Sequence, residues 1–241
     1  MANTLLITGA TSGIGLALAK SSVQKGHQVI VTGRNAEKLS QVEQQLGCRT
    51  ILADSEDLIQ LQNMATTLAR ENIKLDGLVL NAGVFYPDSF ASTSAAAFDH
   101  TMNINTKGPF FTLQYLLPCL NNPASVVLVS SIVVHKGFQG CATYSASKAA
   151  SEAFVRVANM ELAAHGIRIN SVRPGVTATE IQAKAGMTDT QQAELFASLN
   201  STPLGRVLSP DDHVGAIEYL LSDQSVALRN AVIDVDGGYT L

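Results

Sequence analysis

The sequence predicts a doubly wound α/β fold, a Rossmann-type three-layer sandwich built around a parallel sheet of seven strands. Short apolar runs alternate with segments of helical periodicity along the chain of 241 residues. Several of these runs end in glycine-containing or polar turns, which are typical of the ligand-binding edge of such a sheet. The regular alternation of strand and helix favours parallel strands with helices packed on both faces.

The expected elements follow one another without an internal repeat. The expected strands are residues 4–8, 28–32, 50–53, 77–80, 125–129, 167–172 and 232–235. The expected helices follow the glycine loop 9–15, cover 36–46, begin at Ser55, cover 98–117, end near His165, and cover 189–198 and 210–221. The Gly108-Pro109 pair predicts a kink within 98–117, because both residues disfavour a straight helix.

The composition indicates one globular domain over residues 1–241. Hydrophobic residues make up 46% of the chain and charged residues 15%, and no low-complexity segment interrupts it. Residues 176–205 lack a strand pattern, and we interpret them as a lid over the functional site. The net charge of −4 argues against nucleic acid or an anionic membrane as a partner.

The chain also lacks the patterns of a membrane or metal-binding protein. No apolar run approaches the roughly 20 residues of a membrane span. We expect a cytoplasmic protein, because the first residues carry no basic region and Leu5–Ile7 is too short for a signal peptide. Cys48, Cys119 and Cys141 have no metal-like spacing, so we expect reduced thiols and no metal site.

Tyr144 and Lys148 are the candidate acid–base pair. They lie four residues apart at the start of a predicted helix, so they share one helical face. A neighbouring ammonium favours the deprotonated form of a phenol, whose pKa is ordinarily about 10, and such a pair can exchange a proton with an alcohol oxygen. The alternative is a pair of ordinary surface side chains, because Tyr-x-x-x-Lys recurs by chance.

The loop 9–15 is the candidate dinucleotide site. Gly9, Gly13 and Gly15 allow a ligand to approach the backbone closely, and the helix after them presents N–H groups to an anion. The loop lacks the Gly-Lys-Ser/Thr ending of a nucleotide-hydrolysing loop. Arg34 follows the second strand where an acidic residue would bind the ribose of NAD, which favours NADP(H) over NAD(H). A solvated surface arginine is the alternative.

Further polar residues follow the third and fourth strands. Asp54, with Ser55, is expected to contact the adenine of a dinucleotide, or Asp54 caps the helix expected to begin at Ser55, and both roles are compatible. Asn81-Ala82-Gly83 forms a polar turn whose glycine lets the backbone pass close to a ligand. Asn105, in the kinked helix, either holds a water molecule or caps the helix break.

Taken together, these segments resemble the short-chain dehydrogenase/reductase family in its compact branch, and the resemblance covers essentially the whole chain. The matching motifs are Thr8–Gly15, Asn81-Ala82-Gly83, Asn105, Ser131, Tyr144-x-x-x-Lys148, Pro174-Gly175 with Thr179, and Asp236-Gly237-Gly238. Each motif is weak alone, whereas this order and spacing are highly specific.

The resemblance implies a role for each matching residue. Tyr144 would be the general acid of carbonyl reduction, and Lys148 would stabilise its phenolate and hold the nicotinamide ribose. Ser131 would position the substrate carbonyl, and Asn105 would hold a water molecule in a proton relay. Contacts with the cofactor are expected from Gly9, Thr11, Ser12, Gly13, Ile14, Gly15, Arg34, Asn35, Asp54, Ser55, Asn81, Ala82, Gly83, Tyr144, Lys148, Pro174, Gly175, Val176 and Thr179.

Substrate contacts are expected from Ser131, Val133, His135, Phe138 and Tyr144, in a largely apolar pocket. For His135, a solvent-facing position in the loop is the alternative. The expected function is that of an NADP(H)-dependent oxidoreductase that interconverts a ketone and a secondary alcohol by hydride transfer. An NAD(H)-dependent alcohol dehydrogenase and a non-catalytic dinucleotide-sensing protein are the alternatives. Because relatives are commonly tetramers or dimers, a homo-oligomer is expected.

Overall fold

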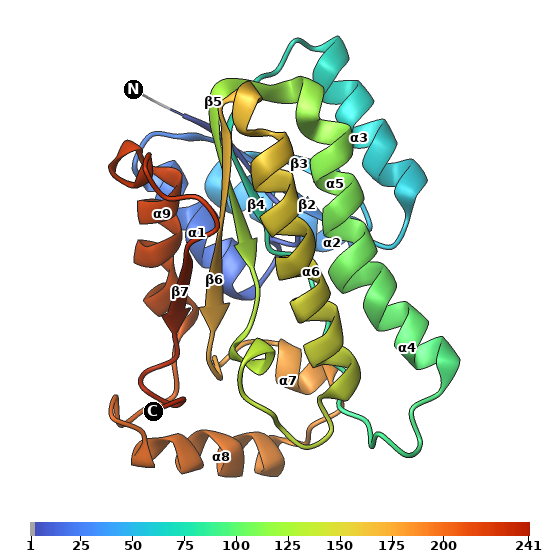
Figure 1. The fold of residues 1–241 in the computed structure, drawn as a ribbon, viewed down its shortest axis with the longest axis vertical. Coiled ribbons are helices and arrows are strands. Elements are labelled where there is room, and N and C mark those ends of the chain that lie inside the picture. The colour runs from blue at the N-terminus through green and yellow to red at the C-terminus, as the bar shows by residue number, and fades with distance from the viewer. Residues whose placement is uncertain (1–2) are drawn as a thin grey trace.

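The computed structural model describes residues 3–241, which form a seven-stranded parallel sheet with helices on both faces (Figure 1). The strand order is β3-β2-β1-β4-β5-β6-β7. The strands are β1 (Thr4–Ile7), β2 (Gln28–Gly33), β3 (Arg49–Leu52), β4 (Leu75–Leu80), β5 (Leu120–Val129), β6 (Ile167–Pro174) and β7 (Val232–Val235). Each neighbouring pair is parallel, so the predicted doubly wound fold is confirmed.

Two helical layers cover the sheet. The helices are α1 (Gly13–Gln24), α2 (Ala36–Leu46), α3 (Leu58–Arg70), α4 (Ala95–Met102), α5 (Gly108–Leu116), α6 (Ala142–Glu161), α7 (Ile181–Lys184), α8 (Asp189–Ser198) and α9 (Val214–Leu221). Leu18, Val42 and Ile217 place α1, α2 and α9 in one apolar cluster. Met64 and Leu116, from α3 and α5, belong to the cluster on the opposite face. Burying each such side chain contributes about 1.5–3 kcal/mol.

The helix after β3 begins later than predicted. We expected it to begin at Ser55, with Asp54 as a possible cap, but α3 begins at Leu58. Its N-cap is Asp57, whose carboxylate accepts hydrogen bonds from the N–H groups of Ile59 and Gln60. Capping by Asp54 was therefore wrong, and Asp54 instead accepts a hydrogen bond from the N–H of Glu56.

The kink predicted within 98–117 is a π-helical turn, Asn103–Lys107, between α4 and α5. Gly108, which follows this turn, lies against the loop after β3. A Cβ atom at Gly108 would lie 2.5 Å from the carbonyl oxygen of Ser55. Glycine is therefore needed here for close contact between backbones, and the π turn brings Asn105 toward α6.

In Figure 1 the arrows of β5, β6 and β7 point toward the segment that contains α7 and α8, at the bottom of the picture, and the other strands of the sheet are parallel to them. The helix predicted near 189–198 has the same bounds as α8, and a capping box between Thr188 and Gln191 starts it. The segment returns to the body through a bridge between Thr177 and Leu208. Among residues 3–241, no helix has both the length and the apolarity that crossing a membrane requires.

Candidate active site

Tyr144 and Lys148 lie on the first two turns of α6, close to the carboxyl end of β5. The Nζ of Lys148 donates a hydrogen bond to the carbonyl of Val129 (2.9 Å) and lies 5.8 Å from the centre of the Tyr144 ring. Lys148 is buried, and the side chain of Ser131 lies close enough to the Tyr144 hydroxyl to favour its deprotonated form. The strand–loop–helix connection thus brings together three residues that the sequence predicted to act together.

Burial changes the pKa of both candidate acid–base groups. Removal from water raises the pKa of Tyr144 to about 12, and the hydrogen bond from Ser131 only partly opposes this. Burial also lowers the pKa of Lys148 to about 8, against the opposing charge of Glu152. The expected lowering of the Tyr144 pKa is therefore not found. Near pH 7 the phenol is protonated, and Lys148 is still mostly an ammonium.

Asn105 fastens the π turn to the loop after β4 and to α6. Its amide donates hydrogen bonds to the carbonyl of Val84 (2.9 Å) and to the hydroxyl of Ser147 (3.1 Å). Its side-chain oxygen accepts from the N–H of Val84 (2.8 Å), and its backbone carbonyl accepts from Ser151 (2.7 Å). These contacts fix the position of Asn105 beside the helix that carries Lys148.

The dinucleotide loop connects β1 to α1, beside the neighbouring strand β4. Between β1 and β4 the strand order reverses, because β2 and β3 lie on one side and β5, β6 and β7 on the other. The hydroxyl of Thr8 accepts hydrogen bonds from the N–H groups of Asn81 and Ala82, both at 3.0 Å. The amide of Asn81 donates to the carbonyls of Thr8 (2.9 Å) and Gly9 (3.1 Å). Such a switch point is the usual ligand-binding crevice of a doubly wound sheet.

The glycines of this loop lie so close to neighbouring residues that a side chain would not fit without a shift. Gly9 has a φ of +61°, and a Cβ atom there would lie 2.7 Å from the Cα of Ala82. A Cβ atom at Gly13 would lie 3.3 Å from the methyl carbon of Thr179, across the cavity. Because the first N–H groups of α1 have no partner within the helix, this cradle fits the pyrophosphate of a dinucleotide.

The adenosine end of the cradle is formed by the residues after β2 and β3. Arg34 is exposed and lines the same cavity as Asp54 and Ser55. A guanidinium at this position suits a 2′-phosphate, which it can bind through two parallel hydrogen bonds. Asn35 has a different role, because its side chain caps α2 by accepting a hydrogen bond from the N–H of Lys38 (2.9 Å).

One cavity of about 480 Å³ joins these parts along the carboxyl edge of the sheet. Most of the predicted site residues line it: Gly9, Thr11, Ser12, Gly13, Ile14, Arg34, Asp54, Ser55, Asn81, Ala82, Gly83, Ser131, Val133, Phe138, Tyr144, Lys148, Pro174, Gly175, Val176 and Thr179. Gly15, Asn35, Asn105 and His135 lie outside this lining. Gly15 lies behind the loop, where a Cβ atom would be 2.5 Å from the amide nitrogen of Asn81.

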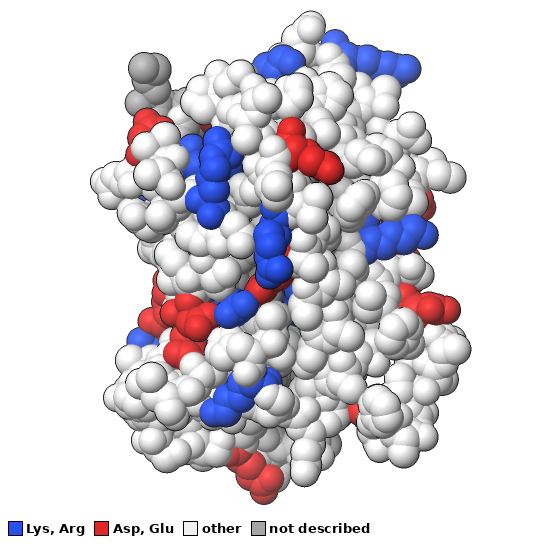
Figure 2. Space-filling model, viewed as in Figure 1, with Lys and Arg blue, Asp and Glu red and all other residues white. Residues whose placement is uncertain are grey.

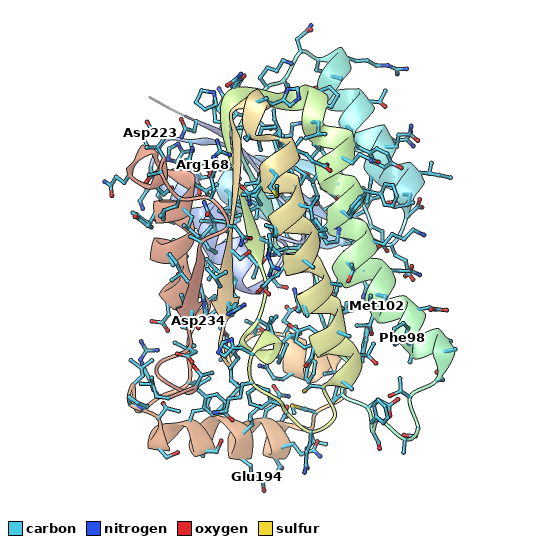
Figure 3. All side chains as sticks on the ribbon, in the orientation of Figure 1. Phe98, Met102, Arg168, Glu194, Asp223 and Asp234 are labelled. Atoms are coloured by element: carbon cyan, nitrogen blue, oxygen red, sulfur yellow. The ribbon has the colours of Figure 1, made fainter. Side chains whose placement is uncertain are left out.

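His135 lies against charged residues from β6 and β7. Its Nδ1 is 3.2 Å from the guanidinium of Arg173, and its Nε2 is 3.8 Å from the carboxylate of Asp234. Figure 3 labels Asp234 on β7. The substrate contact predicted for His135 thus has no support in this arrangement.

Sequence reasoning missed Tyr239, which lines the cavity from the chain after β7. Its ring is stacked on that of Phe138, with the two centres 5.8 Å apart and the planes 7° apart. An aromatic residue directly after the Asp236-Gly237-Gly238 turn was the available signal. That turn ends the last strand at the edge of the sheet where ligands bind.

The fold and this site are those of a nicotinamide-dinucleotide-dependent oxidoreductase, and the chain is similar in sequence to known proteins of this class. The family model described as enoyl-(acyl carrier protein) reductase matches residues 9–240. The chain is 33% identical to 3-oxoacyl-(acyl-carrier-protein) reductase FabG of Rickettsia felis, over 98% of this chain and 95% of that protein. It is also 33% identical to carbonyl reductase (NADPH) 2 of Sus scrofa, over 97% of this chain and 95% of that protein.

The fold of the chain also matches the solved structure of a reductase. The crystal structure of levodione reductase superposes with a TM-score of 0.89 at 25% identity, covering 98% of this chain and 96% of that one. The chain belongs to the short-chain dehydrogenase/reductase family. It is an NAD(P)-dependent oxidoreductase that acts on CH–OH and C=O groups.

Proposed function

We propose that the chain is an NADPH-dependent ketone reductase in which Tyr144, Ser131, Lys148 and Asn105 form the catalytic set. The observation that carries this proposal is the position of Tyr144 beside Ser131 and the buried Lys148, on the wall of the dinucleotide cavity. Reduction of a carbonyl needs a proton donor at this place, and a protonated phenol can supply that proton.

The proposed chemistry assigns one task to each side chain. Bound NADPH would supply the hydride that reaches the carbonyl carbon. Tyr144 donates its proton to the carbonyl oxygen as negative charge develops there, and Ser131 holds that oxygen by a hydrogen bond. The ammonium of Lys148 stabilises the phenolate that remains. Asn105 fixes the start of α6 through Ser147, and so keeps Tyr144 and Lys148 in register.

The rate of NADPH consumption with a panel of ketones tests this proposal. We expect turnover by the wild-type chain and a loss of at least about a hundredfold in Tyr144→Phe, because general acid catalysis typically contributes that much. Cys141→Ala, at another residue that lines the cavity, is the matched control and should retain activity. Wild-type rates in Tyr144→Phe would refute the assignment.

NADP(H) is the proposed cofactor, on the basis of Arg34. We expect Arg34→Ala to weaken NADPH binding about tenfold, which corresponds to about 1.4 kcal/mol, and to leave NADH binding unchanged. Arg49→Ala is the control, because Arg49 forms an ion pair with Glu71 instead of lining the cavity. Fluorescence titration measures both affinities. Equal affinities for NADPH and NADH in the wild-type chain would contradict the cofactor assignment.

Segment 176–205 is the proposed lid. Ile181, Met187 and Leu195 line the cavity from this segment. Glu194 is exposed on the outer side of α8, where Figure 3 shows it pointing away from the body. These apolar side chains, beside the ion-paired Glu180 and Lys184, suit a cover that excludes water from the reaction.

A cytoplasmic homo-oligomer, dimer or tetramer, is the proposed form of the enzyme. Phe110, Val157 and Met160 are 42%, 52% and 78% exposed on α5 and α6. The face that carries these helices has a broad uncharged area in Figure 2, where charges of both signs are otherwise scattered. Sedimentation at micromolar concentration tests this, and a monomer would contradict it. We expect Met160→Glu to weaken assembly, because it would place a charge in an apolar contact.

A further inference from the structure

The charged side chains of the cavity are unevenly distributed. Among the described residues that line it, those with a formal charge are Arg34, Asp54, Lys148, Glu180 and Lys184. Arg34 and Asp54 follow β2 and β3. Glu180 forms ion pairs with Lys184 and with Lys38 of α2, both at 2.8 Å, and these contacts hold it toward the same end. Only Lys148, which belongs to the proposed catalytic set, lies at the end near Tyr144.

Aromatic rings form much of the wall near Tyr144. The ring of Phe85 meets that of Tyr144 edge to face, with centres 5.1 Å apart. Phe138 and Tyr239 are stacked on each other with nearly parallel planes, and both line the cavity. These rings come from the loop after β4, the loop after β5 and the chain after β7, so three separate segments converge on one apolar wall.

Contacts outside the cavity hold Tyr239 in this wall. The Nζ of Lys136 donates a hydrogen bond to the carbonyl of Tyr239 (2.7 Å) and lies 4.5 Å from the centre of its ring. The carboxylate of Asp236 accepts hydrogen bonds from the N–H groups of Gly238 (2.8 Å) and Thr240 (3.0 Å). Tyr239 is therefore fixed from both sides in the chain, and its ring is prearranged before a substrate arrives.

We infer that the substrate is an uncharged ketone with an aromatic or similarly flat apolar group next to the carbonyl, and that Phe138 and Tyr239 determine this specificity. The inference rests on the proposed ketone reduction. Lys148 is the cation that lines the cavity near Tyr144, because Lys136 lies outside the lining and donates to the carbonyl of Tyr239. A carboxylate or phosphate near Tyr144 would therefore lose water for little compensation, at a large cost in desolvation. An aromatic group would instead pack against Phe138 and Tyr239 and gain aromatic contacts.

Two matched pairs of ketones test the inference through kcat/KM with NADPH. Acetophenone and cyclohexyl methyl ketone differ in ring planarity, and we expect acetophenone to be preferred about tenfold. Methyl 4-acetylbenzoate and 4-acetylbenzoate differ in charge, and we expect the ester to be preferred about a hundredfold. Tyr239→Ala should remove most of the preference for acetophenone, and Tyr239→Phe should keep it.

The controls separate failure of the inference from failure of the proposed function. Tyr219→Ala removes a tyrosine from α9, outside the cavity lining, and should leave both preferences unchanged. Unchanged affinity for NADPH in Tyr239→Ala verifies that this variant is folded. If the wild-type chain reduces cyclohexyl methyl ketone and 4-acetylbenzoate as well as their partners, the inference fails and the proposed function stands. If it reduces no ketone, both fail.

Discussion

The ion pair between Glu152 and Arg173 is largely buried, and its carboxylate acts on the proposed catalytic lysine, Lys148. Arg173 donates two hydrogen bonds to the Glu152 carboxylate, at 2.6 and 2.8 Å, and the hydroxyl of Ser130 donates a third at 2.6 Å. The two side chains are only 19% and 11% exposed. Arg173→Met should destabilise the fold by about 3 kcal/mol, because breaking a buried pair leaves an uncompensated charge.

Urea unfolding followed by circular dichroism measures this loss. The double variant Glu152→Gln/Arg173→Met should recover part of the stability lost in Arg173→Met, because no unpaired charge remains. Arg49→Met is the matched control: it breaks the Arg49–Glu71 pair, whose side chains are 35% and 45% exposed, and should cost less than about 1 kcal/mol. If Arg173→Met costs no more than Arg49→Met, the reasoning from burial is refuted.

Three further changes have directions that follow from the structure. Gly9→Ala should abolish NADPH binding, because the added Cβ atom would overlap the turn after β4. Gly26→Ala is the control: Gly26 also has a positive φ but faces open space, so this variant should lose stability and still bind NADPH. Calorimetric titration of NADPH into both variants checks this. Burial lowers the pKa of Lys148 to about 8 in the folded chain, so at this residue the unfolded chain holds more protons between about pH 8 and 10.5. Across that range the urea midpoint of the wild-type chain should rise relative to that of Lys148→Met, and parallel midpoints would contradict this contribution. Burial also lowers the pKa of His213 to about 4, so the stability of the folded chain should fall as the pH drops from about 6.5 to 4. If the urea midpoint of His213→Gln falls as steeply as that of the wild-type chain, the loss belongs to other groups.

His213 also shows how a hydrogen-bond network defines a protonation state. The hydroxyl of Thr177 donates to the carbonyl of Gly175 (2.9 Å), so it accepts from the Nε2–H of His213 (2.8 Å). His213 is fully buried, and its Nδ1 has no hydrogen-bond partner among the described residues. The neutral imidazole of His213 therefore links the start of segment 176–205 to the turn before α9. Protonation of His213 at acidic pH would place a charge without a hydrogen-bond partner at this buried contact.

The sequence predicted best those features that depend on local patterns. The apolar run of β5 and the helix α8 could be located because buried strands and capping boxes leave signals within a few residues. The predicted first residue of α3 was wrong because Asp54 and Asp57 are both residues that commonly cap helices. Only the path of the chain after β3 determines which carboxylate reaches free N–H groups.

Features that depend on distant partners could not be derived in this way. The neighbours of His135, Arg173 and Asp234, come from β6 and β7, so its position in the fold has no local signal. The raised pKa of Tyr144 results from burial in the folded chain, which outweighs the opposing effect of Ser131 and which no local pattern reveals. The stacking of Tyr239 on Phe138 likewise joins residues about a hundred positions apart.

Transfer of an isotopic label tests the central claim most directly. The wild-type chain would be incubated with acetophenone and NADPH that carries deuterium at the transferred position of the nicotinamide. We predict that the alcohol product carries one deuterium on its carbinol carbon, as measured by mass spectrometry, and that Tyr144→Phe forms it at least about a hundredfold more slowly. Alcohol formed without deuterium, or at the wild-type rate in Tyr144→Phe, would contradict the account.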